Sequence, residues 1–266
     1  MLISASRYED IPAFRKSIIE DFINTKTIEY TNYKNEISLI KLSDVTGFIF
    51  WTKNIYPFID TLIKIKDLGI PFYIHHTYTN YNETLETYVN KIEALKGIEI
   101  CAKLGFELIW RYDPIIITNN LTYDNHITNF ELLCKIFNDK TTKCYFSFLT
   151  IYTKLNKIFS EKNINIINNI EQNKKLIEQF EAFAKYYNIN LYACANEYIF
   201  NTVEKGHCIN PEFAKKVGEN TKIVPTRKLC GCAKSIDIGS YNKCNHGCIY
   251  CYANSTKKTL DLLGVK

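Results

Sequence analysis

Short apolar runs rich in β-branched and aromatic residues alternate along the chain with longer segments of helical periodicity. The runs are almost continuously apolar, which is typical of parallel strands covered on both faces. They predict strands over Leu2–Ser6, Thr46–Trp51, Phe72–Thr77, Glu107–Tyr112, Cys144–Leu149, Asn190–Cys194 and Ser235–Gly239. The periodic segments predict helices over Phe14–Asn24, Tyr56–Leu68, Glu83–Leu104 with a break at Gly97, Asp124–Asn138 and Ile170–Tyr187, with a short one after Pro211.

This alternation predicts an α/β fold with a parallel sheet, because parallel strands need a crossover connection between them. The length of 266 residues suits one α/β barrel of about 250 residues. We therefore expect residues 1–266 to form a single domain. Its core would be a parallel (β/α) barrel that is partial, with roughly six to eight strands.

Polar and reactive side chains gather where the predicted strands end. They are Ser6-Arg7, Thr52-Lys53-Asn54, His75-His76-Thr77, Arg111-Tyr112-Asp113-Pro114 and Asn196-Glu197. In parallel α/β folds the carboxyl ends of the strands face the active site, so this pattern favours a site there. The alternative is that strand ends are polar because they meet solvent.

Composition narrows the class of protein. Hydrophobic residues make up 46% and charged residues 23%, which is typical of a globular chain and excludes wholesale disorder. No apolar run approaches the ~18 residues of a membrane span, and the N-terminus lacks a secretory pattern, so we expect a cytoplasmic protein without a membrane partner. The net charge of +5 permits a polyanionic ligand but does not require one.

The chain has ten cysteines, an unusual number for a protein without an export signal. Four lie singly in apolar or mixed stretches and are expected to pack in the core: Cys101, Cys134, Cys144 and Cys194. The other six crowd toward the C-terminus: Cys208, Cys230, Cys232, Cys244, Cys248 and Cys251. Crowded thiols in a reducing compartment favour a metal centre.

Cys244, Cys248 and Cys251 have the spacing Cys-x3-Cys-x2-Cys. Three thiolates in one loop can bind one metal centre, and soft sulfur selects zinc or an iron–sulfur cluster. Structural zinc requires four ligands, so three from one loop leave either a distant fourth ligand or an open position. His246 lies inside the loop, too near its neighbours to be counted as a ligand.

This spacing, with the aromatic Tyr250 before the last cysteine, resembles the cluster loop of the radical S-adenosylmethionine superfamily. There, three cysteines hold three irons of a [4Fe-4S] cluster, and the fourth iron binds S-adenosylmethionine. Reductive cleavage of that cofactor yields a 5′-deoxyadenosyl radical. The resemblance implies a radical enzyme whose cluster is held by Cys244, Cys248 and Cys251. It further implies an electron donor such as flavodoxin or ferredoxin, and a small molecule or nucleic acid as substrate.

The whole chain also resembles a bacterial domain family of unknown function. The matching segments are Ser4–Ala13, Phe50–Asn54, Trp110–Pro114, Cys230–Cys232 and Cys244–Cys251. The resemblance covers essentially the full length and makes residues 206–256 a cysteine-rich iron–sulfur segment at the end of the domain. It names no reaction.

The chain departs from the radical superfamily because its cysteine loop lies last rather than first. A circular permutation would reconcile the two, with Ser235–Gly239 as the superfamily's first strand and Leu2–Ser6 as its second. The usual Gly-Gly-Glu segment after the second strand is replaced here by Ser-Ala-Ser-Arg. Arg7, Arg111 and Asp113 would then be catalytic residues in the same mouth, where Arg can clamp a carboxylate or phosphate.

Cys230-Gly-Cys232 is a separate motif with three readings. Together with Cys208 the two thiols could hold a second, auxiliary iron–sulfur cluster. Either thiol could instead close the main site as a fourth ligand, and all three could simply be packing or redox-active thiols.

Two rival functions remain open at the level of sequence. The cysteines could hold zinc, or a structural or electron-transfer cluster, without any S-adenosylmethionine chemistry. Alternatively the chain could be a metal-dependent barrel hydrolase that uses His75 or His76 with Asp113 and Glu197. Because His75 and His76 are adjacent on a strand, at most one of them can face the mouth.

Overall fold

The computed structural model describes residues 1–31, 36–195, 199, 203–225 and 228–264. At its centre is a sheet of eight strands in the order β10-β1-β4-β5-β6-β7-β8-β9, in which each neighbouring pair is parallel. The strands are β1 (Leu2–Ala5), β4 (Gly47–Thr52), β5 (Phe72–Thr77), β6 (Leu108–Ile115), β7 (Lys143–Phe148), β8 (Asn190–Ala193), β9 (Glu204–Lys205) and β10 (Ile236–Asp237). The predicted parallel α/β fold is confirmed.

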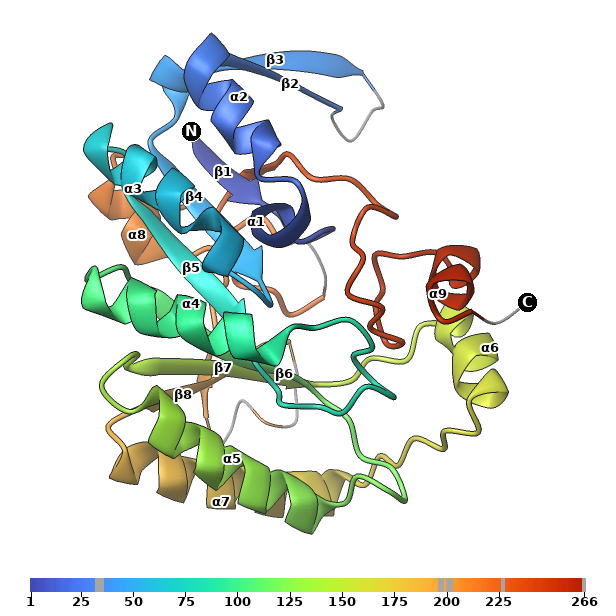
Figure 1. The fold of residues 1–266 in the computed structure, drawn as a ribbon. Helices are drawn as coiled ribbons and strands as arrows, with labels where there is room; N and C mark the ends of the chain where they lie inside the picture. Colours follow the sequence, from blue (N-terminus) through green and yellow to red (C-terminus); the bar gives the residue numbers. More distant parts are fainter. Residues whose placement is uncertain (32–35, 196–198, 200–202, 226–227, 265–266) are drawn as a thin grey trace.

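Helices connect the strands (Figure 1). They are α1 (Ile11–Phe14), α2 (Ser17–Thr25), α3 (Ile59–Asp67), α4 (Lys91–Lys103), α5 (Tyr123–Phe137), α6 (Thr153–Glu161), α7 (Ile170–Tyr186), α8 (Pro211–Lys216) and α9 (Thr256–Leu262). Three long helices begin at a polar side chain that accepts a hydrogen bond from the first turn, namely Asn90, Thr122 and Asn169. Such caps satisfy backbone N–H groups that have no partner within the helix.

The two faces of the sheet are covered differently. Side chains alternate along each strand, so Phe48 and Phe50 of β4 join the core beneath the helices, whereas Ile49 faces the other way. The helix side includes buried side chains of α2, α3, α5 and α7. The opposite face packs against residues 206–233, which include α8. Residues 206–233, the first part of the predicted cysteine-rich segment, therefore cover one face of the sheet.

The predicted barrel is not confirmed, because the sheet of the described residues is not closed. Its outer strands are β10 and β9, which have two residues each and do not pair with each other. In a closed barrel the interior is filled by side chains of the strands alone. Here the segment 206–233 packs against the inward-facing side chains instead, with buried Cys208 and Ile209 among them.

Some predicted elements differ from the structure. The helix expected over Glu83–Leu104 begins only at Lys91, because Asn90 caps it, and Glu86 instead forms a bridge with Cys248. The helix expected over Phe14–Asn24 is split between α1 and α2. The antiparallel hairpin of β2 (Thr27–Thr31) and β3 (Ile37–Lys41) was missed, since its side chains are largely exposed and lack an apolar run.

No helix in the described part of the chain is long and apolar enough to span a membrane.

His126 of α5 is a buried, neutral link between that helix and β6. Its Nε2 lies 2.9 Å from the Ile116 carbonyl, and its Nδ1 lies 2.8 Å from the Tyr112 hydroxyl. The carbonyl can only accept, so Nε2 carries the proton and Nδ1 accepts from Tyr112. Burial lowers the pKa of His126 to about 4, although the bond to Ile116 raises it slightly.

This geometry predicts a specific pH dependence of stability. His126 has its ordinary pKa of 6.5 when unfolded, so the unfolded chain takes up the proton first as the pH falls. Between pH 6.5 and about 4 the residue should therefore cost about 3 kcal/mol of stability. In chemical denaturation across this range, His126→Gln should flatten the dependence of unfolding free energy on pH. An unchanged slope would show that His126 is not held neutral.

Candidate functional site

The loop that contains Cys244, Cys248 and Cys251 is docked against the segment that follows β5. The Leu85 carbonyl accepts a hydrogen bond from the Ile249 amide at 3.1 Å. The His246 carbonyl accepts one from the Tyr88 amide at 2.9 Å. With the bridge between Glu86 and Cys248, these bonds fix the loop beyond the carboxyl end of β5. The sequence motif thus lies near the end of the sheet where a parallel α/β fold places its chemistry.

The three loop thiols interact electrostatically with one another. Cys248 is buried, and Cys244 and Cys251 are half-buried. Burial raises the pKa of the Cys244 thiol to about 12. It also raises the pKa of Cys248 well above its usual value, although the neighbouring Lys53 ammonium opposes this effect. A metal centre bound here would therefore displace protons from the thiols.

A buried charged network lies directly beside Cys248. The Glu86 carboxylate accepts hydrogen bonds from Lys53 Nζ at 2.7 Å, from Thr79 Oγ1 at 2.8 Å and from the Tyr250 hydroxyl. Burial alone would raise the pKa of Glu86, but Lys53 and these hydrogen bonds lower it below its usual value. Lys53 follows β4 and was identified from the sequence as a strand-end residue. Glu86 was missed, because its segment was predicted to be helical.

A second network involves His246 and Asp10. The His246 ring lies 2.7 Å from Asp10, and the same carboxylate oxygen accepts the Lys53 amide at 2.7 Å. Burial lowers the pKa of His76 to about 3, although the Asp10 carboxylate opposes this shift. Among the described residues, neither ring nitrogen of His76 has a hydrogen-bond partner. An unpaired buried imidazole beside the cysteine loop is a candidate ligand-binding group.

His75 lies on the opposite face of β5, as the alternation of strand side chains requires. Its ring stacks on Trp51, with centroids 5.1 Å apart, and its Nε2 lies 2.8 Å from the Cys208 carbonyl. The structure thus separates the two histidines, with only His76 near the cysteine loop.

Trp110 is buried between Phe130 and Phe137 in the core beneath the helices.

Arg111 and Asp113 form an ion pair within β6, with Nη2 of Arg111 2.6 Å from the Asp113 carboxylate. Asp113 also accepts a hydrogen bond from the Ser147 hydroxyl, and Arg111 donates to the Cys208 sulfur at 3.0 Å. The negative charge of Asp113 helps to raise the pKa of Lys53. The ion pair of Arg111 and Asp113 is therefore close enough to interact electrostatically with the network beside Cys248. Both side chains already have protein partners, and their predicted catalytic roles stay predictions.

Arg7 lies at the junction of β1 and β10. Its Nε is 3.3 Å from the Asp237 carboxylate, which also accepts hydrogen bonds of 2.6 Å from each of Ser4 and Ser6. The Arg7 guanidinium also lies over the ring of Trp51, 5.8 Å from its centroid. The Ser-Ala-Ser-Arg segment therefore has a structural role, because three of its side chains bind the one carboxylate of β10.

The other cysteines do not divide as the sequence predicted. Cys194 was expected to pack alone, but its sulfur lies 3.7 Å from that of Cys208. Cys208 also forms a thiol contact with Cys232, and Cys232 forms one with Cys230. The structure thus brings together the three thiols expected for an auxiliary site and adds Cys194 to them.

Among the described residues, no group of three or more His, Cys, Asp or Glu side chains is placed so that it could hold a metal ion. Glu197, a candidate of the hydrolase hypothesis, lies outside the described residues.

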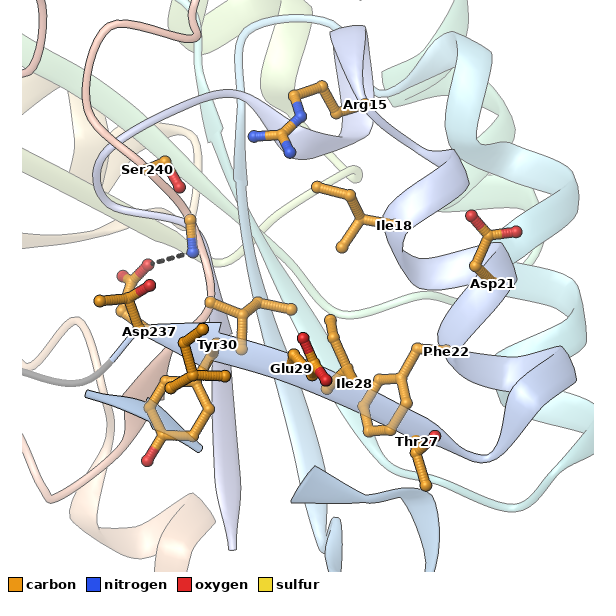
Figure 2. A pocket seen from close by; sticks show the side chains of 14 residues that line it. Arg15, Ile18, Asp21, Phe22, Thr27, Ile28, Glu29, Tyr30, Asp237 and Ser240 are labelled. Atoms are coloured by element: carbon orange, nitrogen blue, oxygen red, sulfur yellow. Dashed lines mark hydrogen bonds between the residues drawn. The ribbon is translucent and has the colours of Figure 1, made fainter. Parts of the chain in front are cut away.

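A separate cavity of about 460 Å³ lies between α2, β2 and the segment after β10 (Figure 2). Asp237 and Arg15 line it, but none of the predicted site residues does.

Comparison with known proteins gives one family. Residues 2–253 match the family model described as Domain of unknown function (DUF1848). The match confirms the expected domain family of unknown function, and it neither tests nor supports the resemblance to radical enzymes. No curated protein matches the chain.

The contacts of Asp237 generate a stability prediction. Its side chain is only 7% exposed, so Asp237→Ala would leave the Arg7 guanidinium and two serine hydroxyls without their acceptor. We expect the free energy of unfolding to fall by about 3 kcal/mol in chemical denaturation. Glu99→Gln, which alters half-exposed ion pairs, is the control and should change it little. Equal effects of the two substitutions would contradict the structural role of Asp237.

Proposed function

We propose that the chain, which belongs to the DUF1848 family, is an iron–sulfur protein of the radical S-adenosylmethionine type. The observation that carries the proposal is the position of the cysteine loop. Cys244, Cys248 and Cys251 lie in a loop docked beyond the end of β5, near the charged side chains that follow the strands. The substrate is a small molecule or a nucleic acid, and a flavodoxin or ferredoxin is the proposed electron donor.

The order of the strands supports a permuted barrel of the radical type. β10, the last strand of the chain, pairs in parallel with β1, the first, at Ile3 with Ile236 and Ser4 with Asp237. Counted from β10, the order along the sheet follows the order along the chain without interruption, apart from the separate hairpin of β2 and β3. A permuted partial barrel requires this arrangement, in which the cysteine loop follows the first strand.

The donor set suits an iron–sulfur cluster. Soft thiolates are the usual ligands of these clusters, and in a [4Fe-4S] cluster each binds a different iron, so the three sulfurs need not meet at one point. When bound, such a cluster supplies one electron for the reductive cleavage of S-adenosylmethionine. The chain supplies the rest of the site, since a protein binds and orients the cofactor and keeps water out.

The side chains around the loop have distinct roles in this proposal. Lys53 places a positive charge beside Cys248 and favours its thiolate form, while Glu86 holds both Lys53 and Tyr250 in place. Asp10 fixes His246 inside the loop. His76 is a buried group whose two ring nitrogens have no hydrogen-bond partner among the described residues, and it is available to the cofactor or substrate.

The test uses anaerobically purified protein whose iron and sulfide have been reconstituted. We expect a [4Fe-4S] spectrum, an EPR signal after reduction that changes when S-adenosylmethionine is added, and formation of 5′-deoxyadenosine. Cys248→Ser should abolish all three. Cys101→Ser should leave them intact, because Cys101 is an equally buried thiol of α4 outside the loop.

The possible outcomes separate the rival functions. Zinc in the loop in place of iron would contradict the proposal. A cluster whose EPR signal does not respond to S-adenosylmethionine would instead favour electron transfer or a structural role. Hydrolase activity that survives Cys248→Ser would favour the metal-dependent hydrolase.

A further inference from the structure

Four tyrosine rings lie together beside the cysteine loop. Tyr8 follows β1, Tyr152 follows β7, and Tyr241 and Tyr252 lie before and after the loop in the segment that follows β10. Lysines of the loop, of α6 and of α9 accompany them. We propose that this tyrosine surface binds single-stranded nucleic acid, whose bases stack on the rings and whose phosphates pair with the lysines.

The four rings form two neighbouring pairs. Tyr8 stacks on Tyr241, with centroids 4.5 Å apart, and Tyr152 lies tilted against Tyr252, with centroids 6.0 Å apart. The pairs are close to each other, because Tyr241 also interacts electrostatically with Tyr152. Tyr241 is 54% exposed, Tyr252 41% and Tyr152 40%. Single exposed aromatic side chains are common, but several neighbouring ones form a patch, which marks an interaction site.

Hydrogen bonds hold this part of the surface before any ligand binds. The Tyr252 hydroxyl donates to the Arg7 carbonyl at 2.5 Å. The Asn242 amide donates to the Ala253 carbonyl at 3.2 Å, which draws the segments of Tyr241 and Tyr252 together. Side chains that are already fixed lose less conformational entropy when a ligand packs on them, so the rings are prepared for stacking.

The chain around the rings is rich in positive charge. Residues 238–258 contain three lysines and no Asp or Glu, and residues 150–160 contain two lysines and no Asp or Glu. These segments meet where α6 lies beside α9 (Figure 1), and the Thr256 hydroxyl donates to the Lys154 carbonyl at 3.1 Å. The lysines of both segments therefore belong to one region of the surface.

The charges of these lysines are not neutralised by the partners that their ammonium groups have. Lys154 donates to main-chain carbonyls, and Lys258 donates to a side-chain amide oxygen at 2.9 Å. Lys243, within the loop, is exposed. The nearby Asp237 carboxylate is already paired with Arg7. The surface thus combines aromatic rings with available positive charge.

This combination fits a single strand of nucleic acid better than other ligands. A base can stack on a side-chain ring only when its own face is free, which is the case in a single strand and not within a duplex. The lysines are distributed over α6, the loop and α9, as the successive phosphates of a strand require. A small anion would instead need donors that converge in a pocket.

A strand bound on these rings would lie beside the cysteine loop. Tyr252 directly follows Cys251, so a base stacked on Tyr252 is presented next to the proposed cluster. The inference rests on the proposed function and deepens it, because it selects nucleic acid rather than a small molecule as the substrate.

The test measures binding of the full-length chain to a fluorescent single strand of about 12 nucleotides by fluorescence anisotropy. DNA and RNA strands of one sequence are compared with the corresponding duplexes. We expect the DNA strand, the RNA strand or both to bind at least about tenfold more tightly than the duplex. Tyr241→Ala and Tyr252→Ala should each weaken binding at least about fivefold, because each removes the stacking of one base. Tyr186→Ala, which removes an exposed ring at the end of α7, should leave binding unchanged.

The salt dependence of binding tests the lysines on the wild-type chain. The logarithm of its binding constant should fall against the logarithm of the salt concentration with a slope of about −3, since about four lysines contact phosphates. Lys243→Gln should make this slope shallower by about 0.7. Lys185→Gln, at an exposed position of α7, should leave the slope unchanged.

Several results would overturn the inference: no binding, a duplex bound as tightly as the single strands, an equal loss in Tyr186→Ala and Tyr241→Ala, or tighter binding to vesicles of anionic phospholipid. The binding assay needs no cluster, so it fails separately from the proposed function. A chain that binds the strand but forms no cluster would contradict only the proposed function. A chain whose cluster responds to S-adenosylmethionine but that binds no strand would overturn only the inference.

Discussion

The parallel pairing of β10 with β1 is the contact on which the position of the cysteine loop depends. It joins the two ends of the sequence, and the Asp237 carboxylate secures it by accepting bonds from Ser4, Ser6 and Arg7. It places the loop that starts a few residues later beside the first strand, and the bonds to Leu85 and Tyr88 then fix the loop beyond β5. The pairing of only two residues from each strand makes this single carboxylate important.

The C-terminal part of the chain divides around this junction. Residues 206–233 precede β10 and cover the inward face of the sheet, whereas the loop from Cys244 to Cys251 follows β10 and docks on the segment after β5. The two groups of cysteines therefore have different charged neighbours. Lys53 and Glu86 lie beside Cys248. Arg111 lies beside Cys208, and Arg7 interacts electrostatically with Cys232.

The central sheet could be predicted because its long strands are almost continuously apolar. This pattern can be recognised in the sequence without knowledge of the tertiary contacts. The short strand β9 carries too little pattern and was not predicted, whereas β10 lies within the predicted strand Ser235–Gly239. The segment around Glu86 has helical periodicity, but the Asn90 cap and the bonds to the cysteine loop override it. Cys194 was assigned to packing because its partners are distant in sequence, and only the fold brings Cys208 to within 3.7 Å.

The central claim is that the C-terminal segment holds an iron–sulfur cluster at the strand ends. The most direct measurement is the iron, sulfide and zinc content per chain of anaerobically reconstituted protein, compared with a variant in which all three loop cysteines are serine. The account predicts about four irons and four sulfides per wild-type chain, all lost from the variant. Iron that survives loss of the three loop cysteines, or a wild-type chain that binds only zinc, would contradict it.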